Sequence, residues 1–465
     1  MIFNKLKSFS SGFAITMVAF ISVEISSSCS KIPSADSTGS CSVTAAFSVP
    51  AGKAQRVNGP SQKVMGSCTA DTFTGTSLPP VGSSSGNTMS VTVNGANCGA
   101  SNDQYANQPC VTVTICSTAT PTTCQTISNI LLDTGSYGLR LFSSAITIPL
   151  TPITTAGGTK TLAECVLFGD GSSEFGPVKY AYVKLGNEPK VEVPIMVIAD
   201  PSFPNTGTPC DTPLADTSPS ETHFNGILGV GLLAADCGAG CASPGSGQYF
   251  TCQNGNCSCD ASADLLAQVT NPISALPTDN NGLILSIPSV PEGGAASVNG
   301  TLFLGVDTQA NNASSGATSG TLTADAGAQI KSKFGAFSST KLASFIDSGS
   351  SILFIPSASS LPDCGCSGGS DYSGLFCPAT IQNLSSINYN SNGSASPAST
   401  VNFSVDNAIN LYNSGNNVFP TMAGSSGKDT SAYMDWGLPF FYGKNVIVGI
   451  EGTNSSLGTG PYWAY

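Results

Sequence analysis

Two short segments, far apart in the sequence, could bring a pair of carboxylates together. One is Ile130–Phe142, with the sequence ILLDTGSYGLRLF, and the other is Ser344–Pro356, with the sequence SFIDSGSSILFIP. In each, an apolar strand leads an aspartate, Asp133 or Asp347, into a turn, and a second apolar stretch follows. Two carboxylates in close contact cannot both ionise easily, so such a pair holds one proton and can act as acid and base together.

The residues around each aspartate suit this chemistry. Gly135 and Gly349 stand two positions after the aspartates and let the backbone turn tightly and approach the carboxylate. Hydroxyl residues flank both glycines and can donate hydrogen bonds around the carboxylates: Thr134, Ser136, Ser348 and Ser350. A single Asp-x-Gly is ordinary turn chemistry. Two copies about a domain apart, each between apolar strands, instead indicate a duplication with pseudo-twofold symmetry.

The elements that must position these turns are predicted to be strands. The 465 residues are too many for one ordinary core, and short alternating apolar runs rich in Gly, Ser and Thr favour an all-β fold. Strands are predicted at Met89–Gly95, Cys110–Cys116, Ile127–Ser136, Ala181–Leu185, Val191–Ile198, Leu283–Ile287 and Gly300–Asp307. Ala263–Val269 is the best short helix candidate. Ala234–Asp260 is interpreted as a cysteine-rich insertion with almost no periodicity.

Charge and motif content exclude several other functions. The net charge is −12 and no basic stripe is visible, which argues against nucleic-acid binding. Gly82–Gly86 matches a serine nucleophile pattern but lacks a preceding strand, and His223 is the only histidine for any triad. Gly229–Gly231 lacks the βαβ unit that a dinucleotide loop requires.

The N-terminus predicts export. Lys5 and Lys7 precede an apolar run at Phe13–Val23, which is too short to cross a bilayer as a helix but suits a signal peptide. Small residues then lead to Cys29, as at the lipidation site of bacterial lipoproteins. We therefore expect a signal peptide at 1–28, a lipid on Cys29 and a tether or N-terminal segment at 29–86. The chain would be extracytoplasmic and anchored to a membrane, at the outer membrane or cell surface. Plain secretion is the alternative, and residues 30–86 could also be a propeptide.

Cysteine usage agrees with export. Of the 17 cysteines, 16 are left after Cys29 and could all close as disulfides in an oxidising compartment. Cys116 and Cys124 bracket a hairpin turn, and Cys364, Cys366 and Cys377 form a second local group. Zinc is the competing interpretation for Cys237, Cys241, Cys252, Cys257 and Cys259. The single histidine and the compartment favour disulfides, so no metal or other cofactor is predicted.

The two aspartate turns resemble the catalytic loops of the pepsin-like aspartic peptidases. The similarity extends over most of residues 88–450 and includes four further elements in the family's order. These are the flap tip Phe168–Ser172 with Phe168, Gly169, Asp170 and Gly171, the first bracing element Asn225–Gly229, the interlobe strand Gly300–Asp307 and the second bracing element Trp436–Phe441.

The resemblance implies a bilobal acid-protease fold with a central cleft. The N-terminal lobe would be 87–308, with Asp133 and the cysteine-rich insertion, and the C-terminal lobe 309–465, with Asp347. It implies a monomeric endopeptidase in which the Asp133/Asp347 pair activates water against a polypeptide substrate in the cleft. Phe168 on its hairpin would cover the substrate.

Three positions depart from the family pattern. Phe168 stands where a tyrosine is usual, Arg140 where a tryptophan commonly follows the first loop, and Asp435 with Trp436 where two hydrophobic residues precede Gly437. A catalytically silent module used for binding or adhesion is therefore the alternative function. The retention of both aspartates in intact turns favours the peptidase, since a binding protein has no need to force two carboxylates together.

Overall fold

The structure, a computed structural model, describes residues 70–82, 86–99, 105–118, 123–317, 319–335, 340–358, 360–367, 370–427 and 432–465. The predicted signal peptide, Cys29, Cys41, Cys68 and most of the segment 29–86 lie outside the described residues. Among the helices of the described part, none is both long and apolar enough to span a membrane.

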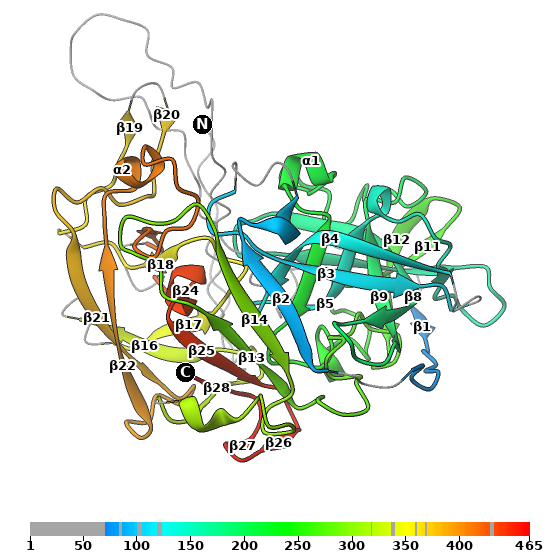
Figure 1. The fold of residues 1–465 in the computed structure, drawn as a ribbon. Coiled ribbons are helices and arrows are strands. Elements are labelled where there is room, and N and C mark those ends of the chain that lie inside the picture. The colour runs from blue at the N-terminus through cyan, green and yellow to red at the C-terminus, as the bar shows by residue number, and fades with distance from the viewer. Residues whose placement is uncertain are drawn as a thin grey trace, which may run out of the picture.

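Nearly all regular structure in the described residues is β, arranged in two large sheets (Figure 1). The first sheet contains β1 (Asp71–Phe73), β2 (Thr88–Val93), β3 (Pro109–Cys116), β4 (Cys124–Asp133), β5 (Tyr137–Phe142), β6 (Thr151–Pro152), β7 (Thr161–Leu167), β8 (Ser173–Lys184), β9 (Val191–Ile198), β10 (Gly226–Val230), β11 (Tyr249–Gln253), β12 (Asn256–Ala263), β13 (Gly282–Ile287), β14 (Val298–Leu304), β15 (Leu322–Thr323), β25 (Lys444–Gly449) and β28 (Tyr462–Ala464). The second sheet contains β16 (Ile330–Phe334), β17 (Leu342–Ile346), β18 (Leu353–Ile355), β21 (Gln382–Tyr389), β22 (Ala398–Val405), β23 (Ala423–Ser425) and β24 (Met434–Trp436).

The minor elements are short. They are the hairpins β19 (Cys366–Ser367) with β20 (Ser370–Asp371) and β26 (Asn454–Ser455) with β27 (Gly458–Thr459), and the helices α1 (Pro219–Thr222) and α2 (Ala408–Tyr412). In Figure 1 the blue-to-green strands gather on one side and the yellow-to-orange strands on the other. The predicted all-β, two-lobed fold class is confirmed. The lobe boundary at residues 308 and 309 stays a prediction.

A run of antiparallel strands joins the two halves. β14 pairs with β2, β13 pairs with both β14 and β25, and β25 pairs with β28. Strands from the beginning, middle and end of the described chain therefore form one continuous stretch of sheet. Their inward residues belong to a single apolar core cluster that extends into both halves, so the halves are fixed relative to each other.

One stretch is more regular than its own pattern indicates, and one local prediction was wrong. The cysteine-rich stretch contains β11 and β12, because pairing with β7 and the Cys252–Cys257 bridge at the hairpin turn order a segment that has little periodicity. The helix expected at Ala263–Val269 is absent from the described structure there. The Asp264 carboxylate accepts hydrogen bonds from the N–H groups of Leu266 and Ala267, both at 3.0 Å, and so stabilises a turn instead.

Six disulfides join cysteines of the described residues. They are Cys98–Cys110, Cys116–Cys124, Cys165–Cys210, Cys237–Cys241, Cys252–Cys257 and Cys364–Cys377. The predicted bridge across the hairpin of β3 and β4 is confirmed, and Cys364 pairs with Cys377. The side chains of Cys259 and Cys366 are outside the described residues. Several disulfides in one chain are typical of proteins that fold in an oxidising compartment.

Candidate active site

The two aspartate turns meet face to face. Asp133 ends β4, and Asp347 directly follows β17. A Cβ atom added to Gly135 would lie 2.6 Å from the Cγ atom of Asp347, and one added to Gly349 would lie 2.7 Å from Oδ1 of Asp133. Both distances are below any real contact, so each turn needs glycine because the carboxyl of the opposite turn packs against it.

Each carboxyl receives the same two donors from its own turn. The N–H of Gly135 donates to Oδ1 of Asp133 over 2.7 Å, and the Ser136 hydroxyl donates to Oδ2. The N–H of Gly349 donates to Oδ1 of Asp347 over 2.7 Å, and the Ser350 hydroxyl donates to Oδ2, also over 2.7 Å. These equivalent contacts orient both carboxyls.

The other two hydroxyls do not contact the carboxyls but connect the turns. The Thr134 hydroxyl donates to the carbonyl of Ile346 over 2.9 Å, and the Ser348 hydroxyl donates to the carbonyl of Leu132 over 2.7 Å. Each also accepts, at 3.0 Å, the backbone N–H of the other residue. This reciprocal set of four hydrogen bonds holds the halves in register at the carboxyl pair.

The environment of the pair favours a shared proton. Asp133 and Asp347 are 0% exposed, and their carboxyls are hydrogen-bonded to each other. Burial, followed by the charge of Asp347, raises the pKa of Asp133 well above its usual range, and burial also raises the pKa of Asp347. A buried pair of this kind retains one proton at a pH where isolated carboxylates are fully ionised.

Both turns are braced by a strand from elsewhere in the chain. β10 lies between β4 and β5, and the N–H of Gly231 just after it donates to the Ser136 carbonyl over 2.9 Å. β24 pairs with β17 and β18, and the N–H of Leu438 donates to the Ser350 carbonyl over 2.8 Å. The two segments that the sequence indicated as braces occupy equivalent places.

Asp435 on β24 adds a third carboxyl to the second turn. Its Oδ2 atom lies 2.6 Å from the Ser350 hydroxyl oxygen, which also lies 2.7 Å from Oδ2 of Asp347. A hydroxyl has one proton and can donate to only one of these oxygens. Burial, followed by the charge of Asp347, raises the pKa of Asp435 well above its usual range. The Ser350 hydroxyl therefore connects the carboxyl of Asp435 to that of Asp347.

Arg140 on β5 is the centre of a buried ionic network. Its Nη2 atom is 2.7 Å from Oε1 of Glu164 and 2.6 Å from Oδ1 of Asp236, and all three side chains are fully buried. The hydroxyl of Tyr249 binds the other oxygen of Asp236. Burial raises the pKa of Glu164, and the neighbouring charge of Arg140 opposes that shift. The network joins β5 to the strands β7 and β11.

The predicted flap is the hairpin of β7 and β8. The Phe168 N–H donates to the Ser172 carbonyl over 3.0 Å, Gly171 has a φ of +87°, and Asp170 accepts from the N–H and hydroxyl of Ser172. Phe168 itself is fully buried in an apolar cluster that includes Tyr105. The tip is thus packed against the protein and does not project from it. A covering role for Phe168, Gly169, Asp170 and Gly171 stays a prediction.

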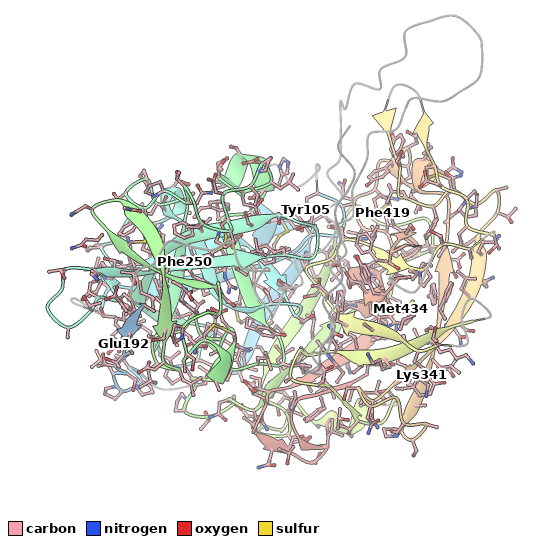
Figure 2. The ribbon with its side chains drawn as sticks, turned by 180° about the vertical axis from the view of Figure 1, so that it is seen from behind. Tyr105, Glu192, Phe250, Lys341, Phe419 and Met434 are labelled. Atoms are coloured by element: carbon pink, nitrogen blue, oxygen red, sulfur yellow. A yellow bond between two sulfur atoms is a disulfide. The ribbon has the colours of Figure 1, made fainter. Side chains whose placement is uncertain are left out.

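Tyr105 is a site residue that the sequence did not indicate. Its side chain is fully buried, and its hydroxyl lies 3.5 Å from the carbonyl oxygen of Gly349. Burial raises its pKa, and the charges of Asp133 and Asp347 add to that effect. Figure 2 shows Tyr105 between the two halves, in the same region as Phe419 of the C-terminal half. No motif surrounds Tyr105, so only the fold reveals that it lies beside the second aspartate turn.

Comparisons with known proteins place the chain in a family. Residues 83–465 match the family described as "Protein of unknown function (DUF3443)", and the chain belongs to it. A search of curated proteins gave no match. Among solved structures, the chain is similar to an aspartic proteinase from Irpex lacteus, with 16% identity and a TM-score of 0.48 over 81% of this chain and 96% of that one.

Proposed function

We propose that this protein is an aspartic endopeptidase that hydrolyses polypeptides with the Asp133/Asp347 pair. One observation carries the proposal. Two turns from opposite halves of the chain hold their carboxyls in a mutual hydrogen bond, buried and oriented by equivalent donors. Such an arrangement costs stability, because burial and mutual repulsion oppose ionisation of both groups. A pair kept at this cost indicates a chemical use.

The chemistry follows from the shared proton. A water molecule attacks the scissile carbonyl while the ionised member of the pair takes a proton from that water. The protonated member donates its proton to the carbonyl oxygen. Proton transfer then proceeds to the leaving nitrogen as the tetrahedral intermediate collapses. Gly135, Ser136, Gly349 and Ser350 keep the carboxyls aligned through these steps.

Access of substrate requires movement, because the pair is fully buried. Tyr105 lies beside the second turn and shares an apolar cluster with Phe168 at the hairpin tip, so movement of these two segments is the opening that the proposal requires. The closed arrangement is also the observation that favours the second candidate, a catalytically silent module used for binding or adhesion. The same experiment distinguishes the two candidates.

The test measures hydrolysis of a denatured protein by the purified full-length chain from pH 2 to pH 8. We expect cleavage that is fastest below neutral pH, where the pair keeps its proton. Asp133→Asn and Asp347→Asn should each reduce the rate at least about 10³-fold, since each removes half of the acid–base pair.

Asp363→Asn is the matched control. Asp363 also forms an Asp-x-Gly turn, with the Gly365 N–H donating to its Oδ1 over 2.8 Å, but it is exposed. Its substitution should leave the rate unchanged. Folded wild type that cleaves no faster than the two asparagine variants at any pH would identify a silent module.

We also infer that the chain is exported and anchored by a lipid on Cys29, with a polypeptide in the cleft as its partner at the membrane. The disulfides support export. Mass spectrometry of the mature N-terminus should give a diacylated Cys29. An unmodified N-terminus would show plain secretion instead.

A further inference from the structure

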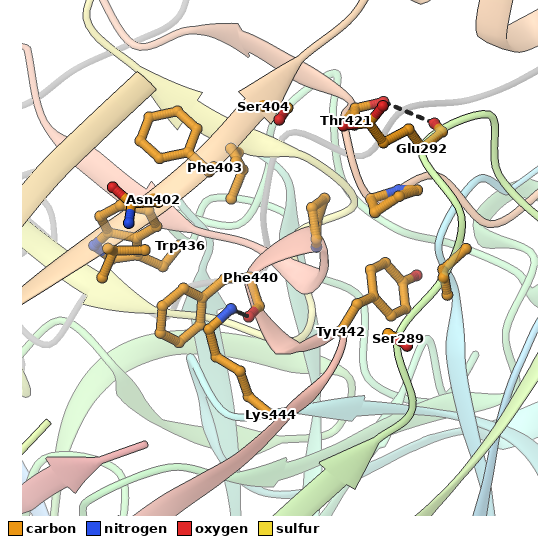
Figure 3. A pocket seen from close by; sticks show the side chains of 15 residues that line it. Ser289, Glu292, Asn402, Phe403, Ser404, Thr421, Trp436, Phe440, Tyr442 and Lys444 are labelled. Carbon is orange, nitrogen blue, oxygen red and sulfur yellow. Dashed lines mark hydrogen bonds between the residues drawn. The ribbon is translucent and has the colours of Figure 1, made fainter. Parts of the chain in front are cut away.

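A groove lined by residues of both halves lies apart from the carboxyl pair. It is formed by two adjoining pockets of about 190 Å³ and 830 Å³, which share Ser289, Val401, Asn402 and Lys444 in their walls. Along one wall, the first pocket is lined by Val401–Ser404 and the second by Ser399–Asn402. Together they follow the strand β22 for most of its length. Figure 3 shows the smaller pocket, with Lys444 at one side and Glu292 at the other.

The wall formed by β22 is a sheet edge. In the described part of the chain, β21 is the strand that pairs with it, and no strand pairs with its other side. Every second residue of an edge strand directs its N–H and C=O outward, where another strand can bind. The sequence of β22, ASTVNFSV, has no charge and no proline, the usual protection of an edge.

Lys444 supplies a positive charge in this groove. It is half-buried, and among the described residues it forms no ion pair. Its ammonium donates to the carbonyl of Phe440 over 2.7 Å and lies 4.6 Å from the centre of the Phe440 ring. Burial lowers its pKa to about 8, so it is still largely charged at neutral pH. Of the three donors of an ammonium group, this arrangement uses one.

The remaining walls limit which ligand fits. On the aromatic side, the partly exposed Phe403 packs on the buried Trp436, with 5.5 Å between ring centres, and Trp436 lies 5.3 Å from the buried Phe440. An apolar side chain could pack there. Glu292 is exposed at the opposite side and would repel a second acidic group. A polyanion is therefore disfavoured, and a strand with one carboxylate is favoured.

We propose that the groove binds an extended polypeptide segment as an added strand beside β22, with an acidic side chain of that segment paired to Lys444. Edge pairing supplies main-chain hydrogen bonds, while Lys444 and the aromatic side supply selectivity. Successive residues of β24 face opposite sides, so Asp435 contacts Ser350 while Trp436 lines the groove. The site is thus separate from the carboxyl pair and does not depend on peptidase activity.

The test uses full-length protein that carries Asp133→Asn, so that no peptide is cleaved. A synthetic library of random eight-residue peptides, acetylated and amidated at the ends, is screened against this protein. Retained peptides should have Asp or Glu at one position. Lys444→Met should weaken their binding at least tenfold, and Lys444→Arg should weaken it less, because it keeps the charge.

Lys341→Met is the matched control. The Lys341 ammonium also binds a backbone carbonyl, that of Gly393, and lies 3.9 Å from the centre of the Tyr389 ring, but it does not line the groove. Its substitution should leave binding unchanged.

Two measurements identify the mode of binding. Methylation of the peptide nitrogens that face β22 should abolish binding, because it removes their N–H donors. Methylation of the alternate nitrogens, which face away from β22, should leave binding intact. Added peptide should slow hydrogen exchange at 399–404 in protein that has the native Lys444. The proposal is overturned if no peptide is retained, if retained peptides bind Lys444→Met equally well, or if exchange at 399–404 is unchanged.

Discussion

The turn at Asp133 and the turn at Asp347 are built by the same contacts, but the residues behind them differ. Each aspartate accepts one glycine N–H and one serine hydroxyl. Behind the first turn lies the Arg140 network. Behind the second lies a single buried carboxyl, Asp435, which contacts the turn through Ser350.

The disulfides are also distributed unequally between the two halves. Five of the six disulfides among the described residues lie in the predicted N-terminal lobe, and one, Cys364–Cys377, lies in the C-terminal lobe. The Cys165–Cys210 bridge holds β7 of the flap hairpin, whose Glu164 also binds Arg140. The first turn is therefore backed by ion pairs and a nearby disulfide, whereas the second is backed by one buried carboxyl.

The largest expected loss of unfolding free energy comes from the Arg140 network in the first half. Arg140→Met would leave Glu164 and Asp236 buried without their cation, so the free energy of unfolding should fall by about 3–5 kcal/mol. Chemical denaturation measures this change. Lys160→Met is the control, because Lys160 forms a partly exposed ion pair with Asp71 at 3.0 Å and should lose at most about 1 kcal/mol. Equal losses in the two variants would contradict a structural role for the network.

Removal of one disulfide from each half should also lower the free energy of unfolding by different amounts. Cys165→Ser with Cys210→Ser opens a loop of 45 residues and should cost about 2–4 kcal/mol. Cys364→Ser with Cys377→Ser opens a loop of 13 residues and should cost about 1 kcal/mol less, because a shorter loop restricts the unfolded chain less. Thermal unfolding under oxidising conditions checks both. A larger loss from the second pair would mean that the C-terminal half depends more on its covalent link.

The sequence predicted most of the fold that carries the site. β9 has the predicted bounds, Val191–Ile198, because its apolar residues and β-branched content leave no other local choice. The aspartate turns were found because an apolar strand, Asp-x-Gly and a second strand lie contiguous in the chain. The strands β11 and β12 were missed, since their order comes from β7 and a disulfide rather than from their own pattern.

Long-range contacts at the site had no local signal. Arg140 and Asp435 were recognised as unusual, but their partners Glu164 and Ser350 are identified only when separate strands meet. The hydroxyls of Thr134 and Ser348 were expected near the carboxylates. They instead bind the opposite turn, because that turn approaches closely enough to offer both a carbonyl and an N–H.

The third carboxyl should give stability a characteristic pH dependence. An unfolded aspartate has a pKa of about 3.9, and burial raises the pKa of Asp435 well above that. Above about pH 4 the folded protein binds a proton that the unfolded chain releases. The contribution of Asp435 to the unfolding free energy therefore falls by about 1.4 kcal/mol per pH unit until its raised pKa is reached.

Asp435→Asn removes this term. The variant should match the wild type at pH 3 and become progressively more stable than it as the pH rises, as measured by denaturation at each pH. Asp363→Asn, at an exposed turn, should run parallel to the wild type. A constant difference between Asp435→Asn and wild type across this range would mean that Asp435 is ionised in the folded protein.

The smallest expected change in unfolding free energy concerns the reciprocal hydrogen bonds of Thr134 and Ser348, where the two halves make equivalent contacts. Thr134→Val and Ser348→Ala each remove one hydroxyl from the reciprocal set of four hydrogen bonds, and each should cost about 1 kcal/mol of unfolding free energy. Because each hydroxyl accepts the N–H of the other residue, the losses should not be additive in the double variant. Equal single losses with a measurable coupling energy would show that the halves contribute equally at this contact. Unequal losses would extend the asymmetry of Arg140 and Asp435 to the turns themselves.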